Sequence, residues 1–192
     1  MTRRRSGSHQ ILRWRGRPGF MRPRVPPSTL GVGLVLLGLL LPGGAAAAEP
    51  EPIAVLDFEL IDTSLQGELQ GTSRAELDRL DRITEIVRER LGASGRYRVV
   101  DTAPAADEIA RAGNLRTCNG CELDIAAGLG AEVVLIGWVQ KVSNLILNIN
   151  AVVRDVATGR PRAGGSVDIR GNTDESWTRG IAYLLEKEIL AE

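Results

Sequence analysis

Two cysteines with two residues between them form the sequence feature best suited to chemistry. The segment Cys118-Asn-Gly-Cys121 lies directly before a stretch, starting at Glu122, that is predicted to be helical. Unpaired N–H groups at a helix start favour negative charge and would lower the pKa of a nearby thiol, which suits a redox-active dithiol. A metal site and a structural disulfide between Cys118 and Cys121 are the alternatives. Because Glu122 opposes thiolate formation, the sequence favours the structural disulfide.

Three acidic residues cluster where the first predicted strand ends. Asp57 and Glu59 are two positions apart and are expected to share a face of an extended chain, and Asp62 follows them. Ligands bind at the carboxyl ends of parallel strands, where a carboxylate pair suits acid–base chemistry or a divalent cation. The alternative, which the sequence favours, is that Asp57 accepts hydrogen bonds from nearby backbone N–H groups while its neighbours face water.

A tryptophan, a lysine and several amides lie on or beside two adjacent predicted strands. Aromatic residues are enriched at the centres of protein interfaces, so this set is the best candidate for a partner surface. In the alternative interpretation the tryptophan belongs to the core and the amides merely face water. The set consists of Trp138, Lys141, Asn144, Asn148 and Asn150.

Other common chemistries are excluded by what residues 49–192 lack. The single histidine is His9, so this part of the chain has no residue for a Ser-His-Asp or Cys-His mechanism or for a histidine metal site. No glycine-rich phosphate-binding motif is present. The segment Gly171-Asn-Thr-Asp174 is predicted to cap a helix, because Asp174 and Glu175 would repel an anion. We therefore expect no cofactor.

Residues 1–48 have the pattern of a cleaved secretory signal peptide. They hold eight arginines and no acidic residue, an apolar run at 30–41, and alanines that end in a cleavage site at Ala48. The apolar run is shorter than the roughly 20 residues of a membrane span, although an uncleaved anchor is the alternative. Translation starts at Met1 or at Met21. The leader has no cysteine to accept a lipid, so we expect no membrane anchor after cleavage and a periplasmic location.

Residues 49–192 are predicted to form one α/β domain. They carry 16 basic and 24 acidic residues, a net charge of −8, which disfavours nucleic-acid binding. Apolar and alternating patterns predict strands at 53–60, 97–101, 132–140, 145–154 and 165–170. Residues 61–71 are expected to be a polar loop. Helices are predicted from about 72 to 91, with a Ser73–Glu76 capping box, and at 104–112, 122–129 and 173–189.

The spacing of the apolar residues also predicts which helix faces point inward. In the first long helix they are Leu77, Leu80, Ile83, Val87 and Leu91, and in the last helix they are Trp177, Ile181, Leu184, Leu185 and Ile189. The order β-α-β-α-α-β-β-β-α predicts a mixed sheet of about five strands with helices packed on it. The first strands should be parallel neighbours, and the last three should form an antiparallel meander.

The layout resembles the α/β domain at the start of TolB and in the outer-membrane lipoproteins CsgG and LpoB. The motifs that carry the resemblance are Ile53-Ala-Val-Leu-Asp57-Phe58, Tyr97-Arg-Val-Val-Asp101, Val133-Val-Leu-Ile-Gly137 and Arg154-Asp155-Val-Ala-Thr-Gly159. More narrowly, the cysteine segment, residues 137–144 and residues 171–177 resemble a bacterial family of secreted domains of unknown function.

The resemblance implies a non-enzymatic envelope domain that acts by binding other proteins. The chain departs from CsgG and LpoB in lacking a lipidation cysteine, and from TolB in lacking a propeller, so their partners are not carried over. The expected function is a periplasmic protein-binding or assembly module whose partner is another envelope or periplasmic protein. A redox or small-molecule-handling protein that uses Cys118 and Cys121 is the alternative, and a carboxylate-based hydrolase is a third.

Overall fold

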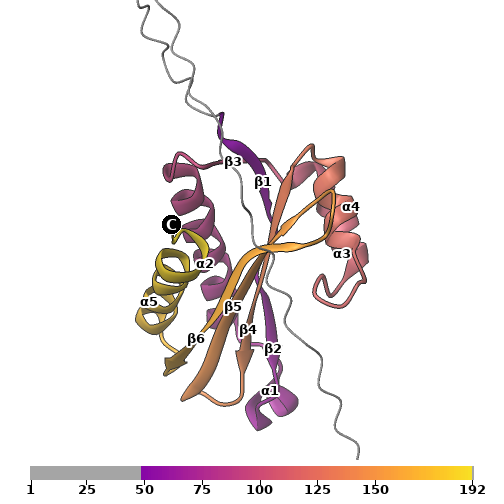
Figure 1. The fold of residues 1–192 in the computed structure, drawn as a ribbon. Coiled ribbons are helices and arrows are strands. Elements are labelled where there is room, and N and C mark those ends of the chain that lie inside the picture. Colours follow the sequence, from indigo (N-terminus) through magenta and orange to yellow (C-terminus); the bar gives the residue numbers. More distant parts are fainter. Residues whose placement is uncertain (1–48, 192) are drawn as a thin grey trace, which may run out of the picture. The chain divides into compact units, whose positions relative to one another are not determined.

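The apolar strand residues build a mixed β-sheet in the computed structural model, which describes residues 49–191 (Figure 1). The strands are β1 (Glu51–Val55), β2 (Glu59–Asp62), β3 (Tyr97–Val99), β4 (Val133–Lys141), β5 (Ile146–Asp155) and β6 (Pro161–Arg170). Their order is β3-β1-β4-β5-β6, and β2 pairs with β4 beyond the end of β1. β1 is parallel to β3 and β4, whereas β4, β5 and β6 form an antiparallel meander. The predicted mixed α/β sheet is confirmed.

Helices cover both faces of this sheet, but to different extents. They are α1 (Leu65–Gln70), α2 (Arg74–Ala93), α3 (Ala106–Ala112), α4 (Cys121–Gly128) and α5 (Asp174–Leu184), with a 3₁₀ turn, η1 (Ala103–Ala105), and a π-helical turn, η2 (Leu185–Ile189). α2 and α5 lie on one face, and the smaller α3 and α4 lie on the other, as Figure 1 shows. None of the helices within residues 49–191 is long and apolar enough to cross a membrane. The predicted signal peptide, residues 1–48, lies outside the described residues.

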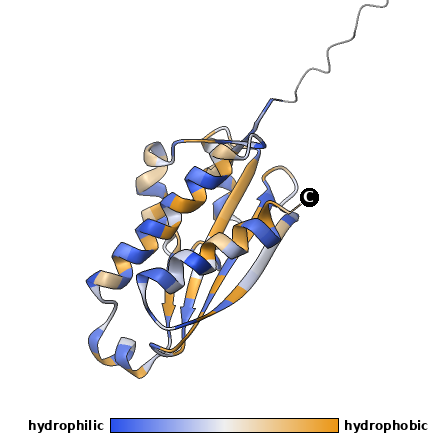
Figure 2. Ribbon diagram, turned by 90° about the vertical axis from the view of Figure 1, so that its left-hand side faces the viewer, coloured by the Kyte–Doolittle hydropathy of each residue, from blue (hydrophilic) through white to orange (hydrophobic). Residues whose placement is uncertain are grey.

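The larger core lies between the sheet and the two long helices. Figure 2, seen from the side of α2 and α5, shows hydrophobic and hydrophilic residues alternating along these helices. The predicted inner face of the last helix is confirmed, because all five of its residues are buried. The Ser73–Glu76 capping box at the start of α2 is also confirmed. Leu77 was predicted to face inward and is 43% exposed, whereas Glu76 and Thr84 are buried.

The first predicted strand, residues 53–60, is broken into β1 and β2. Val55 pairs with Leu135 and Glu59 pairs with Trp138, so the chain holds one more residue than β4 between these two pairs. Phe58 is buried in this interruption, and its backbone N–H donates to Thr84 Oγ1 (3.1 Å). The aromatic ring lies over Gly137, where a Cβ atom would collide with it. The missing side chain of Gly137 therefore makes room for Phe58.

Candidate functional site

A disulfide joins Cys118, in the loop before α4, to Cys121, the first residue of that helix. Their Cα atoms are 5.6 Å apart. The two intervening residues have positive φ angles, 59° at Asn119 and 104° at Gly120. Asparagine and glycine tolerate this left-handed region better than other residues do. The Asn-Gly pair therefore permits the tight loop that brings the cysteines together.

A buried glutamate lies beside the disulfide. Glu122 is 2% exposed and pairs with Arg154, which also donates to the carbonyl of Gly159 (3.1 Å). Its Oε2 atom lies 3.4 Å from Cys118 Sγ. In residues 49–191, only Cys118, Cys121 and Glu122 are grouped closely enough to suggest a metal site. With both sulfurs bonded to each other, this group has no thiolate to offer a metal ion.

The strand-end carboxylates Asp57 and Glu59 form hydrogen bonds with different partners. Asp57 Oδ1 accepts a hydrogen bond from Arg88 Nη2 (2.8 Å), and the Asp57 side chain is 73% exposed. Glu59 instead accepts the backbone N–H of Leu115, 2.7 Å away in the loop before α4. Asp57 was expected to accept hydrogen bonds from backbone N–H groups. That expectation is wrong, because Asp57 binds Arg88 and it is Glu59 that accepts a backbone N–H. The extra residue between β1 and β2 breaks the alternation on which the predicted carboxylate pair depended.

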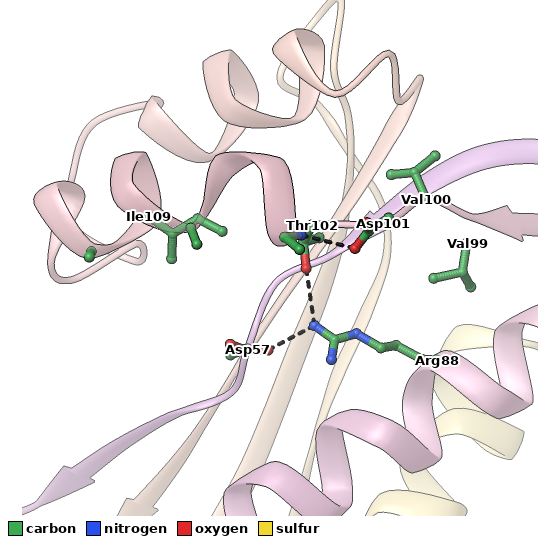
Figure 3. A pocket seen from close by; sticks show the side chains of 10 residues that line it. Asp57, Arg88, Val99, Val100, Asp101, Thr102 and Ile109 are labelled. Carbon is green, nitrogen blue, oxygen red and sulfur yellow. Dashed lines mark hydrogen bonds and ion pairs between the residues drawn. The ribbon is translucent and has the colours of Figure 1, made fainter.

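Asp57 and Arg88 line a cavity of about 710 Å³ at the carboxyl ends of β1 and β3 (Figure 3). Arg88 Nη2 also donates to the carbonyl of Val55 (3.1 Å) and to Thr102 Oγ1 (3.4 Å). After β3 the chain enters η1 and α3, whereas after β1 it passes through β2 and α1 before α2 begins on the other face of the sheet. Ligands of open α/β sheets bind at the carboxyl ends of the strands. Here the guanidinium is occupied in joining the two strand ends, so its visible role is structural.

Trp138, Asn148 and Asn150 are brought together on the sheet face that α3 and α4 cover only in part. Trp138 pairs with Asn150, and Gln140 pairs with Asn148, across β4 and β5. Asn148 then lies opposite Asp168 on β6, and Asn150 lies opposite Ser166. We call this surface the uncovered face; its residues are Trp138, Gln140, Asn148, Asn150, Ser166 and Asp168.

The side chains of the uncovered face are ordered by contacts with one another. Asn148 Nδ2 donates to Asp168 Oδ1 (2.8 Å), and Asn148 Oδ1 accepts from Ser166 Oγ (3.0 Å). The guanidinium of Arg116 lies 5.5 Å from the centre of a Trp138 ring, a cation–π contact. Trp138 is half-buried, which places it between the two predicted alternatives of core residue and surface anchor. No pattern in the sequence indicated that Arg116 would lie over this ring.

Lys141 does not belong to this surface. Its side chain is 1% exposed and lies on the opposite face of β4, two residues beyond the buried Val139. Lys141 Nζ donates to Asp62 Oδ2 (2.9 Å) and to Glu76 Oε1 (2.6 Å). The placement of Lys141 in the partner surface is therefore wrong. Side chains alternate along a strand, so residues two positions apart share a face. The spacing of Lys141 from Val139 was therefore the signal that could have placed the lysine on the buried face.

Two carboxylates keep the buried lysine charged. Burial by itself disfavours all three charged forms. Hydrogen bonds from Ser64 and Lys141 outweigh burial at Asp62 and hold its pKa below the usual 3.8. Hydrogen bonds from Lys141 and Ser73 likewise lower the pKa of Glu76 from 4.5. The two carboxylates raise the pKa of Lys141 above 10.5.

The buried network holds one end of the molecule together. Asn172 donates to Glu76 Oε1 (2.8 Å) and accepts the indole N–H of Trp177 (3.0 Å), which links α2 to α5. Asn144, the remaining residue of the predicted surface, lies in the β4–β5 turn and donates to Gln66 of α1 (2.7 Å). The predicted polar loop at 61–71 thus contains the end of β2 and a helix fixed to that turn.

An exposed apolar cluster at this end was not predicted. Leu65 and Leu69 of α1 are 70% and 74% exposed, and Leu145 in the β4–β5 turn is 72% exposed. Val142 and Ile146, on either side of that turn, are about half exposed. Isolated exposed apolar residues are ordinary, but a contiguous group marks an interaction site. We call these five residues the apolar end.

Several solved structures are similar to this chain at low sequence identity. The LpoB C-terminal domain from Salmonella enterica has a TM-score of 0.47 and 16% identity, covering 64% of this chain and 84% of that one. A PelC dodecamer from Paraburkholderia phytofirmans has a TM-score of 0.46 and 18% identity, covering 72% and 86%. TolB from Acinetobacter baumannii has a TM-score of 0.36 and 13% identity, covering 65% and 24%. These similarities are too distant to transfer a partner or an activity.

No curated protein has a sequence that matches this chain. A family model does match, over residues 51–189, which is most of the chain and nearly all of the described domain. This agrees with the resemblance to domains of unknown function that the motifs indicated. The chain therefore belongs to the family described as "Protein of unknown function (DUF2380)".

Proposed function

We propose that residues 49–192 form a non-enzymatic module that binds another protein in the bacterial periplasm through the uncovered face. One observation carries this proposal: a sheet face that presents a half-buried tryptophan beside polar side chains ordered by the bonds of Asn148 to Asp168 and Ser166. Ordered polar side chains around an aromatic residue suit a protein interface, because little side-chain entropy is lost on binding.

The apolar end extends this binding surface. Ile146 is 48% exposed and lies on the same side of β5 as Asn148 and Asn150, so the uncovered face continues to the β4–β5 turn, which Asn144 links to α1. Interfaces combine an apolar centre with a polar rim. We therefore place the centre of the proposed interface near Ile146 and its polar part over Asn148 and Asn150.

The geometry offers less support to a reactive site. Asp57 is engaged by Arg88, Glu59 by a backbone N–H, and the cysteine sulfurs by each other. In a reduced form, the carboxylate of Glu122 beside Cys118 would oppose the thiolate that a redox mechanism requires. The redox alternative therefore ranks below protein binding.

Photocrosslinking in the native envelope tests the proposal. A benzophenone amino acid replacing Asn148 should give a discrete adduct with one other protein, whereas the same group replacing Glu89, exposed on α2, should give none. Adding Asn150→Arg should abolish the adduct, because a long cation would occupy the middle of the uncovered face. Equal adducts from both positions, or none from position 148, would refute the proposal.

A further inference from the structure

The last strand of the sheet has one side without a partner. β6 is ten residues long and pairs with β5 alone among the described strands. The N–H of Gly171 donates to the carbonyl of Leu145, and Leu147 lies opposite Ile169. In an antiparallel ladder this fixes which residues bond to β5, namely the odd-numbered ones. The N–H and C=O groups of Gly164, Ser166, Asp168 and Arg170 consequently point away from the sheet.

Nothing in residues 49–191 covers this edge. Every even-numbered residue of β6 is exposed, whereas the odd-numbered ones from Ala163 to Ile169 are at least partly buried on the side of α5 and η2. Gly164 and Gly165 lie at the middle of the strand, so no bulky side chain obstructs the approach of another backbone. A row of free N–H and C=O groups on a long, accessible strand is a template for pairing with another strand.

We propose that β6 pairs antiparallel with β6 of a second copy of this chain, centred on Gly165. In this register Gly164 lies opposite Ser166, and both have outward-pointing backbone groups, as a hydrogen-bonded pair requires. The register also sets Arg162, the extra residue where the pairing with β5 shifts register, opposite Asp168 at both ends of the interface. Opposite charges directly across a strand pair are favourable, and like charges are unfavourable.

Charge complementarity favours this register over those centred on Ser166 and Asp168. Centring the pair on Ser166 would set Arg162 against Arg170, and centring it on Asp168 would set that aspartate against its own copy. Arg162 also contacts Asp155 and Glu51, and Asp168 accepts from Asn148, so in the dimer each side chain would be shared between its own chain and the second copy. Exposed ion pairs are individually weak, so the backbone hydrogen bonds hold the two strands together and the ion pairs set the register.

The pairing has a geometric consequence for the rest of the molecule. Residues directly opposite each other lie on the same face of a sheet, so the uncovered faces of the two copies lie side by side on one continuous surface. α2 and α5 of both copies lie together on the other side. The dimer does not depend on the proposed function, but it would double the surface that a partner protein meets.

Sedimentation velocity of the protein purified from its native cells tests the pairing. The wild type should form dimers as concentration rises. Asp168→Arg should weaken dimerisation about tenfold, because each of two ion pairs becomes a repulsion, and Arg162→Asp with Asp168→Arg should restore it. Ser166→Pro removes an outward N–H without removing a bond to β5 and should abolish the dimer. Glu89→Arg on α2 is the matched control and should change nothing.

Three results would overturn the inference. These are a wild type that stays monomeric throughout, a dimer unaffected by Asp168→Arg, and a charge swap that fails to restore association in a protein with a native melting curve. If Ser166→Pro lowers the melting temperature, Asp168→Arg decides, because Arg162→Asp also removes the ion pairs of Arg162 with Glu51 and Asp155. None of these outcomes depends on whether the uncovered face binds another protein.

Discussion

At the scale of single residues, the buried charge of Lys141 is the main departure from the sequence-based expectation. The sequence places this lysine one residue after Gln140, at the end of an apolar strand, where lysine ordinarily faces water. Its position is decided by two carboxylates distant in sequence, Asp62 and Glu76. The Ser73–Glu76 capping box was predictable from local spacing, but the second role of Glu76 as a partner of Lys141 was not, since it depends on how α2 packs on the sheet.

Replacing Lys141 should leave two buried carboxylates without their cation. Lys141→Met should lower the free energy of unfolding by about 3–5 kcal/mol at neutral pH. The cost should shrink between pH 8 and pH 5, because the unpaired carboxylates then have raised pKa values and can be neutralised by protonation. Denaturant unfolding across this pH range measures both effects.

The wild type, unlike the Lys141→Met variant, should lose stability from this network as pH falls. The folded-state pKa values of Asp62 and Glu76 lie below their usual 3.8 and 4.5, so the stability that these groups contribute is present above about pH 4.5 and is lost as pH falls through the lowered values. Lys187→Met removes an exposed lysine and is the control, with an expected change within about 0.5 kcal/mol. A pH-independent cost of Lys141→Met would contradict the account.

The cysteine pair should prove structural. The bond closes a loop of only four residues, so Cys118→Ser with Cys121→Ser should cost at most about 2 kcal/mol on the chain-entropy model. Partner binding should be unchanged. Thiol titration of the unfolded protein should detect two thiols only after reduction. A variant that folds normally but loses its biological effect would instead favour the redox alternative.

At the scale of elements, the existence of most helices and strands was predictable, whereas their interruptions were not. The run from Ile53 to Leu60 looks continuous because apolar residues dominate it. It breaks because Phe58 is inserted over Gly137, a contact between residues far apart in sequence. The helix α1 was missed because it is only six residues long and contains a glycine, so it is too short for helical periodicity to stand out.

Gly137→Ala tests the cause of the break in the first strand. The new methyl group would collide with the Phe58 ring, and overpacking of this kind costs about 1–3 kcal/mol. Gly128→Ala in α4 is the matched control: no atom lies near its added Cβ, so helix propensity should make it neutral or slightly stabilising. Thermal unfolding compares the two. Equal stability of both variants would show that Phe58 does not require the glycine.

At the scale of the whole molecule, hydrophobic patterning carried most of the correct prediction. Helical spacing from Trp177 to Ile189 identified the face that closes the core, and the alternation from 145 to 154 identified the half-covered strand β5. The same alternation correctly set Asn148 and Asn150 on one face. Alternation along β4 places Lys141 with the buried Val139 on the other face, whereas Asn144 lies in the β4–β5 turn, where strand alternation does not apply.

The predicted cleavage of residues 1–48 can be tested on the whole protein. If residues 1–48 are a cleaved signal peptide, amino-terminal sequencing of protein purified from the periplasm should begin at Glu49. Disulfides persist in that compartment, which suits the Cys118–Cys121 bond. An intact chain starting at Met1 or Met21 in the cytosol would contradict both the location and the class of partner proposed.

The most direct test of the proposed function is the affinity for the protein that crosslinks from position 148, measured by titration calorimetry. Asn150→Arg should weaken binding about tenfold or more, without changing the melting temperature, because it places a long charged side chain within the uncovered face. Glu89→Arg, on the outer side of α2, should bind as the wild type does. Unchanged affinity of the Asn150→Arg variant, or an equal loss in both variants, would contradict the assignment of the uncovered face as the binding surface.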